Sequence, residues 1–202
     1  MSHAIQQPPF VPSMLGPVSL VTAPTEQPVT LDEVKDHCDV DLDDDDLLLG
    51  GKIAAAVSYV GHSRGWALMP ATYDVGVIGW WRMPLRIPWA LLRTIDSVKY
   101  FDQTGTEQTL AASNYVVHTP QGQRGSLELI SDFQAPALKR RAYPITIRFG
   151  AGYASRALVP ETAKEAIYHL VDFLYENRGA AGADLPPTVE HLLDSLIPAG
   201  YA

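Results

Sequence analysis

The sequence has few of the residues that build disulfides, metal clusters or membrane spans. Cys38 is its single cysteine, so the chain can form no intramolecular disulfide and no cysteine-based metal cluster. It has no run of 18 apolar residues, and its N-terminus lacks the basic-then-apolar pattern of a secretory signal. We therefore expect a soluble protein with no membrane partner, assembled in a reducing cytoplasm.

Positive charge is also scarce. The chain has 15 Lys and Arg against 23 Asp and Glu, a formal net charge of -8. This balance argues against a protein whose main task is to grip nucleic acid phosphates. Apolar residues make up 47% of the 202 residues, which is enough for one domain with a sizeable core, or one domain plus an arm.

Six of the 16 prolines fall within residues 1–28, which therefore cannot hold a helix. We expect an extended arm there. It is either a disordered terminus or a strap over a neighbouring subunit that buries Phe10, Val11, Met14 and Leu15.

Two helices are expected after the arm. Thr30 and Glu33 form a capping box for a short helix that ends near residues 37–39, and Val29 and Val34 are spaced as a hydrophobic staple. A second helix is expected from about Asp45 to Val60, with Gly61 as its left-handed cap. Its buried stripe comprises Leu49, Ile53, Ala56, Val57 and Val60. The pair Gly50-Gly51 costs on the order of 1 kcal/mol per glycine against alanine, which indicates close packing or a bend.

The most strongly bounded element is a helix over residues 160–178. Pro160 suits its first position, and Gly179 offers a left-handed C-cap. One face is apolar and should pack on the second helix; it comprises Ala163, Ala166, Ile167, Leu170, Val171 and Leu174. Four charged residues fall largely off that face, namely Lys164, Glu165, Asp172 and Glu176.

Between these helices the chain has a β character. Six strands are predicted, over residues 72–78, 95–101, 106–110, 115–119, 126–130 and 143–149. Pro84 and Pro88 mark irregular edges or loops. Of the adjacent pair Trp80 and Trp81, at least one should pack on a loop or another subunit.

A short helix over residues 188–197 and an apolar tail, 198–202, close the chain. These elements predict an α+β fold.

Three signals for chemistry fail on their context. The acidic stretch 39–46 alternates Asp like a calcium loop, but Asp44 stands where that loop needs glycine and Gly50 where it needs glutamate. We interpret it as a solvated turn that caps the next helix.

Ser63 in the sequence GHSRG matches a hydrolase nucleophile elbow, but a helix enters it and a β region leaves, the reverse of that motif. The six histidines form no zinc motif. We therefore predict no catalytic residue, no cofactor and no metal.

Five segments in this order resemble the head–tail connector (adaptor) proteins of long-tailed double-stranded DNA phages, prophages and gene transfer agents. They are PVTLDEVKDHCDVDLDDDDLL (28–48), IAAAVSYVGHSRGWAL (53–68), RTIDSVKYFDQTGTEQTL (93–110), ITIRFGAGY (145–153) and VPETAKEAIYHLVDFLYENRG (159–179). The resemblance implies a small α-helical bundle with a β-rich insertion between the second and third helices. It divides the chain into an arm (1–28), a single connector domain (29–197, with helices in 30–62 and 160–178 and the insertion in 66–149) and a tail (198–202).

The resemblance also implies a function. Such proteins are structural and form a ring, commonly of twelve subunits, under the portal in the virion neck. The ring extends the DNA channel, lets double-stranded DNA pass without specific binding, and offers a platform to stopper or tail proteins. The segment that docks into the portal falls here on Leu192, Leu193, Leu196, Ile197 and Tyr201.

Two further surfaces follow as hypotheses. Residues off the apolar face of the long helix are candidates for contact with the next subunit, namely Tyr168, Asp172, Tyr175 and Arg178. The acidic turn is a candidate to face the channel through Asp41, Asp43, Asp44, Asp45 and Asp46, because like charge would repel passing DNA. The alternatives are a small serine hydrolase that uses Ser63 and a monomeric β-sandwich binding module.

Overall fold

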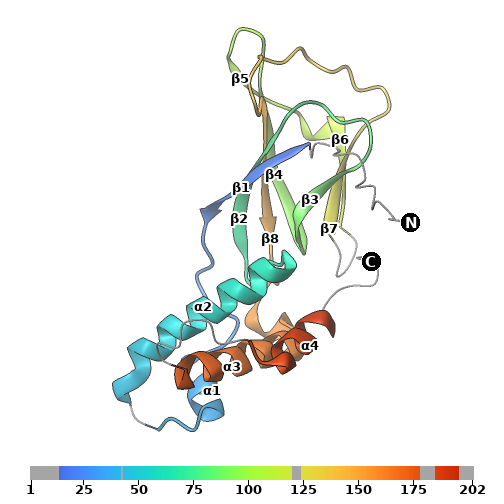
Figure 1. Cartoon of the computed structure of the whole chain (residues 1–202). Helices are drawn as coiled ribbons and strands as arrows, with labels where there is room; N and C mark the ends of the chain where they lie inside the picture. The colour runs from blue at the N-terminus through green and yellow to red at the C-terminus, as the bar shows by residue number, and fades with distance from the viewer. Residues whose placement is uncertain (1–13, 42, 120–123, 178–184, 196–202) are drawn as a thin grey trace, which may run out of the picture.

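A computed structural model of the chain describes residues 14–41, 43–119, 124–177 and 185–195. The helices gather at one end of an elongated molecule, and the strands form the other end (Figure 1). We call these the helical end and the β part. In the described residues, strand β1 comes first, α1 and α2 follow, strands β2 to β8 come next, and α3 and α4 close the chain.

Helix α1 (Leu31–His37) begins as predicted. The Glu33 amide donates to the Thr30 hydroxyl at 3.1 Å, and the Thr30 amide donates to the Glu33 carboxylate at 2.6 Å. The capping box is therefore complete. Val29 and Val34 are both buried in the same core cluster, as the staple requires.

Helix α2 (Asp46–Arg64) is longer than predicted. It runs through Gly61, which is not its cap, and ends at Gly65, which adopts the left-handed conformation with φ 63° and ψ 43°. The predicted stripe faces the core: Leu49, Ile53, Ala56 and Val60 are buried and Val57 packs against them. The close packing expected at Gly50 and Gly51 is wrong, because both are exposed and a Cβ added to either would meet no atom within 4 Å.

Helix α3 (Glu161–Glu176) packs on α2, as predicted. Pro160 is its N-cap and Asn177 its C-cap; the proposed cap Gly179 lies outside the described residues. Five of the six predicted face residues are buried and Leu174 is partly buried. Lys164 corrects the prediction: it is only 8% exposed, because its stem lies against the core while its ammonium group pairs with Glu161 at 2.7 Å.

Helix α4 (Pro187–Ser195) packs on α3. It covers most of the predicted 188–197 helix. Val189 and Leu193 are fully buried in the helical core, and Leu192 packs partly against it.

The β part contains two antiparallel sheets. The five-stranded sheet has the order β1 (Leu15–Thr22), β2 (Ala71–Val77), β8 (Ile145–Ala151), β4 (Leu92–Phe101) and β5 (Glu107–Thr109). The three-stranded sheet has the order β3 (Leu85–Ala90), β7 (Arg124–Leu129) and β6 (Tyr115–His118). All six predicted strands are present within a few residues of their expected bounds.

A second core lies within the β part. Ile145, Ile147 and Phe149 of β8 are buried and alternate with the more accessible Thr146 and Arg148, as predicted. Trp81 is buried in this core. Trp80 donates from Nε1 to the Pro136 carbonyl at 2.8 Å, which confirms that one tryptophan of the pair packs on a loop.

Strand β1 corrects the description of residues 1–28 as an arm separate from the domain. It pairs with β2 along the edge of the main sheet, and Met14 and Leu15 pack against the core of their own chain. Met14 and Leu15 are thus partly buried by their own chain, Phe10 and Val11 lie outside the described residues, and the strap over a neighbour stays a prediction. The sequence allows strand β1 because Val18–Thr22 has no proline and is rich in β-favouring residues.

Strand β3 is not among the six predicted strands. It contains Pro88 and lies at the edge of its sheet, which agrees with the irregular edge that Pro84 and Pro88 were expected to mark. Pro88 is tolerated because β3 is an edge strand whose register with β7 breaks between Arg86 and Ala90.

Candidate functional site

The GHSRG motif does not form a nucleophile elbow. Ser63 lies inside α2, and its hydroxyl donates to the Val60 carbonyl of the same helix at 3.2 Å. The neighbouring His62 ring nitrogen bonds the Ser58 carbonyl at 2.7 Å. A helical serine turned to its own backbone has neither the strain nor the exposure of the elbow, so the serine hydrolase is not supported.

The acidic turn is held by one lysine. Asp43–Asp45 form a 3-10 turn that leads into α2, and the Lys35 ammonium reaches Asp43 at 2.7 Å and Asp46 at 2.8 Å. The hydrogen bonds to both carboxylates raise the pKa of Lys35, and the same contact lowers the pKa of Asp43. Lys35 thus ties the end of α1 to the start of α2, a role that the sequence analysis missed.

The predicted capping of α2 by this turn is wrong. Asp45 is the N-cap residue, but its side chain makes no hydrogen bond to the helix backbone. Its carboxylate accepts a short hydrogen bond from the Tyr175 hydroxyl of α3 instead. The turn is therefore bound to both neighbouring helices, while Asp41 and Asp44 remain exposed.

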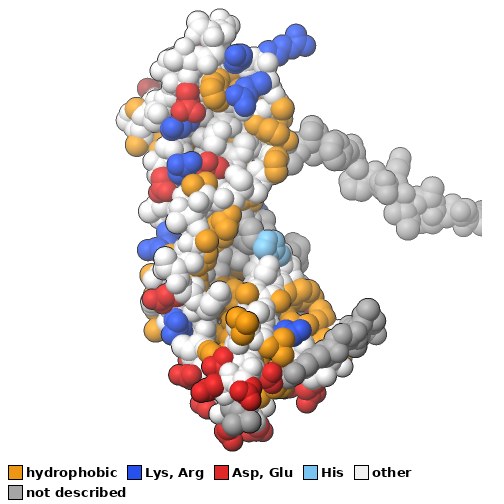
Figure 2. Space-filling model, turned by 90° about the vertical axis from the view of Figure 1, so that its left-hand side faces the viewer, with side chains coloured by type: hydrophobic (Ala, Val, Ile, Leu, Met, Phe, Trp, Pro, Cys, Tyr) orange, Lys and Arg blue, Asp and Glu red, His pale blue; other side chains and the backbone are white. Residues whose placement is uncertain are grey.

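The two ends of the molecule differ in charge. Residues 66–151 contain nine Lys and Arg against six Asp and Glu, whereas the rest of the chain contains six against 17. Figure 2 shows the acidic side chains gathered at the lower tip, which is the helical end, and basic side chains over the β part. The acidic turn is part of that tip, so its exposed carboxylates face outward from the subunit.

The candidate residues for subunit contact are partly used within the subunit. Tyr168 stacks on His37 with ring centroids 5.3 Å apart, and burial first, with nearby carboxylates, raises the pKa of Tyr168 to about 12. Tyr175 binds Asp45. Asp172 is partly exposed, and Arg178 lies outside the described residues.

Of the five candidate portal-docking residues, two lie in α4 and pack on the helical core, and three lie outside the described residues. Leu193 is fully buried and Leu192 partly buried against the helical core. The Tyr59 hydroxyl of α2 donates to Glu190 at 3.0 Å and adds a polar tie between α2 and α4. Leu196, Ile197 and Tyr201 lie outside the described residues. Leu193 is therefore unavailable to a partner while α4 stays docked.

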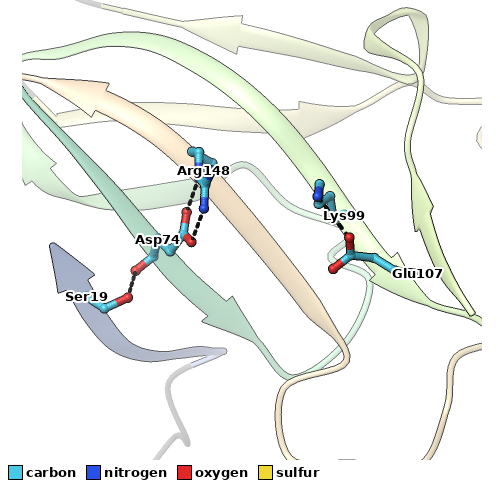
Figure 3. A network of polar contacts seen from close by, with 5 residues as sticks. All are labelled: Ser19, Asp74, Lys99, Glu107 and Arg148. Atoms are coloured by element: carbon cyan, nitrogen blue, oxygen red, sulfur yellow. Dashed lines mark hydrogen bonds and ion pairs between the residues drawn. The ribbon is translucent and has the colours of Figure 1, made fainter. Parts of the chain in front are cut away.

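One face of the five-stranded sheet carries polar side chains that form ion pairs between neighbouring strands (Figure 3). Arg148 of β8 makes a bidentate pair with Asp74 of β2, with both nitrogen–oxygen distances at 2.8 Å. On the next strand pair, Lys99 binds Glu107 at 2.8 Å. Each of these charged side chains is paired with an opposite charge on the neighbouring strand. We therefore interpret them as links between strands and not as catalytic groups.

Within the described residues, no group of three His, Cys, Asp or Glu side chains could hold a metal ion. None of the described helices has the length and apolar character needed to cross a membrane.

Comparison with known proteins connects this fold to virion necks. Residues 28–78, which span α1, the acidic turn, α2 and β2, match the model of the phage gp6-like head-tail connector protein family. No curated protein sequence matches the chain.

Three solved structures are similar to the chain over most of its length. A chain of the virion of a native gene transfer agent particle is 24% identical with a TM-score of 0.75, covering 89% of this chain and 94% of that one. A chain of the neck of the empty particle computed with C6 symmetry is 25% identical with a TM-score of 0.74, covering 90% and 95%. A chain of the neck of the native particle computed with C12 symmetry is 22% identical with a TM-score of 0.72, covering 90% and 94%.

The family model covers α1 to β2, and the shared fold extends the likeness to 90% of the chain. In sequence, residues 28–78 are similar to the phage gp6-like head-tail connector family, and in fold most of the chain is similar to chains of gene transfer agent particles.

Proposed function

We propose that this chain is a structural connector of a virion neck, one subunit of a ring that sits under the portal and extends the DNA channel toward the stopper or tail proteins. The observation that carries this is the fold shared with neck chains of a gene transfer agent particle. Those necks were computed with C6 and C12 symmetry, which supports a cyclic ring, and we propose twelve subunits. We expect assembly to take place in the host cytoplasm.

The role is non-enzymatic. It needs surfaces that repeat around a ring, using one heterologous contact in each subunit. Two observations support this assignment. The Ser63 hydroxyl donates to the backbone of its own helix, and the charged residues Arg148 and Asp74 of the sheet are paired with each other.

We assign the portal contact to Leu192 and to the segment after residue 195, which includes Leu196, Ile197 and Tyr201. Leu193 is reassigned to anchoring α4, because it is fully buried in its own subunit. Contact with the next subunit through Tyr168, Asp172, Tyr175 and Arg178 remains a proposal. Tyr168 and Tyr175 would then meet the neighbour only through the parts that their own-chain contacts leave exposed.

Electron microscopy of portal-containing particles tests the proposed function. We expect density for a cyclic ring of this chain between the portal and the tail. Particles with complete necks that lack such a ring would refute the connector role. Mass measurement of the purified chain with the portal protein gives a second readout: a 1:1 complex without a ring would favour the monomeric binding module.

A further inference from the structure

The two sheets leave four strand edges in the described part of the chain. They are β1 and β5 on the five-stranded sheet, and β3 and β6 on the three-stranded sheet. An edge strand presents unpaired N–H and C=O groups, so proteins blunt the edges that must stay free of other strands.

Two of these edges are blunted. Strand β5 is only three residues long, and its side chains are all polar and exposed, Glu107 among them. Strand β3 carries Pro88 and loses register with β7 between Arg86 and Ala90. A short polar strand and a proline-interrupted strand are both poor templates for a further strand.

The other two edges present exposed apolar side chains, although β1 contains Pro17 and shifts register against β2 between Leu15 and Val18 and between Leu20 and Thr22. Val18–Thr22 of β1 and Tyr115–His118 of β6 contain no proline, Lys, Arg, Asp or Glu, and we call them the open edges. Each carries two consecutive exposed apolar residues: Leu20 (56% exposed) with Val21 (44%), and Val116 (48%) with Val117 (36%). On β6, the successive residues Val116 and Val117 point to opposite faces of the strand, whereas on β1 the register shift between Leu20 and Thr22 interrupts this alternation. On a free monomer this combination favours aggregation.

The open edges lie on opposite flanks of the β part. In Figure 1 the C-terminal end of β1 runs out to the left flank, and β6 lies at the right flank. They also belong to different sheets. One copy can therefore offer one open edge to each of two neighbours, which is the arrangement that a closed ring with a heterologous contact requires.

We propose that the open edge of β1 pairs with the open edge of β6 in the next copy, so that main-chain hydrogen bonds join neighbouring subunits by strand addition. This inference rests on the proposed ring. The partner is a second copy of the chain, because the same chain supplies both uncharged edges and nothing on either edge repels the other.

Disulfide trapping tests the pairing. Cys38→Ser removes the natural thiol, and cysteines are then introduced in pairs, one at Ser19, Leu20 or Val21 and one at Val116 or Val117. We expect at least one pair to give a ladder of covalent oligomers on oxidation of neck-containing particles. The matched control pairs Leu20→Cys with Gln108→Cys on the blunted edge of β5 and should give no ladder.

Four outcomes would overturn the pairing. Dimers from Leu20→Cys alone would mean that two β1 edges meet each other. A ladder between Phe10→Cys and Val116→Cys, without one from β1, would assign the β6 edge to the N-terminal segment. Particles with a visible ring and no cross-link from any β1–β6 pair would refute this interface and leave the connector function intact, whereas complete necks without the ring would refute both.

Charge placed on the open edges gives an independent readout. Leu20→Lys with Val116→Lys adds exposed charges at positions that the core does not use, so the chain should still fold, with an unchanged melting temperature. We expect ring assembly to be lost. The control Gln108→Lys should assemble normally, and normal assembly of the double variant would refute the proposal.

Discussion

At the scale of single residues, a few polar contacts hold the acidic turn of the helical end in place. Lys35 is only 13% exposed at its side chain and holds both Asp43 and Asp46. Without it, the carboxylates that enter α2 would repel one another at short range. Lys35, which the sequence shows only as a charged residue, thus links α1 to the start of α2.

Gly51 should be replaceable with a gain in stability. It lies inside α2, is exposed, and has open space where a Cβ would be. Gly51→Ala should therefore raise the free energy of unfolding by about 1 kcal/mol, measured by urea unfolding of the purified chain. Gly61→Ala is the matched control in the same helix: its Cβ would lie 3.0 Å from the Trp66 carbonyl oxygen, so no such gain is expected. Destabilisation by Gly51→Ala would contradict an open outer face of α2.

Asp102 should make stability depend on pH in acid. Hydrogen bonds from the side chains of Thr104 and Gln108, with backbone amides of the same hairpin, lower its pKa to about 2 from a usual 3.8. A lowered folded-state pKa stabilises the native state above the unfolded pKa, and this contribution is lost as pH falls from about 4 toward 2. Asp102→Asn should therefore be less stable than the wild type at pH 7, and the difference should shrink in that window.

Urea unfolding of both proteins from pH 7 to pH 2 measures this difference. Asp132→Asn, at an exposed loop position, serves as the control for removal of one negative charge. A difference between wild type and Asp102→Asn that stays constant over the whole range would contradict the role given to the carboxylate.

At the scale of elements, α4 is a short helix that only two fully buried residues and one described side-chain hydrogen bond hold in place. Val189 and Leu193 are its two fully buried residues, and Glu190 adds its bond to Tyr59. Leu193→Ala should weaken docking of α4 by about 2–5 kcal/mol, because it removes a buried leucine side chain. Hydrogen exchange should then speed up across 187–195 before it changes in α2, since a short peripheral helix can open on its own.

Leu192→Ala is the matched control for that prediction, because Leu192 is only partly buried. It should leave exchange in α4 much closer to wild type. Equal effects of the two substitutions would mean that Leu193 does not anchor the helix, and the portal contact first assigned to it would regain support.

At the scale of the whole molecule, the division of charge is the feature that bears on DNA passage. The helical end is acidic and the β part is slightly basic, so the subunit is electrostatically polar along its length (Figure 2). If the acidic turn faces the channel, its carboxylates repel the phosphates of passing DNA.

Reversal of this charge should slow DNA release. Asp41 and Asp44 are the residues of choice, because both are exposed and the Lys35 contacts do not involve them. Particles with Asp41→Lys and Asp44→Lys should eject DNA more slowly than wild type, and added salt should reduce the effect because it screens the new attraction. Glu165→Lys with Asp132→Lys changes net charge equally and serves as the control. Unchanged ejection would place the turn away from the channel.

The sequence alone determined the elements whose signals are local. The capping box at Thr30 and the apolar faces of α2 and α3 appear where the spacing predicts them, and so does the alternation of β8. Each is set by contacts within a few residues or by a regular period, which one chain segment contains in full. Four of the five segments that carry the family resemblance contain these elements.

Only the tertiary structure decided the features that join distant segments. β1 became a strand because β2 lies beside it, and Asp45 left its own helix backbone to bind Tyr175, 130 residues away in sequence. Lys164 is only 8% exposed and Leu193 is fully buried because helices that are distant in sequence pack together in the helical end. Which strand edges stay open depends on strand order in the two sheets, and that order is a long-range property that no local pattern contains.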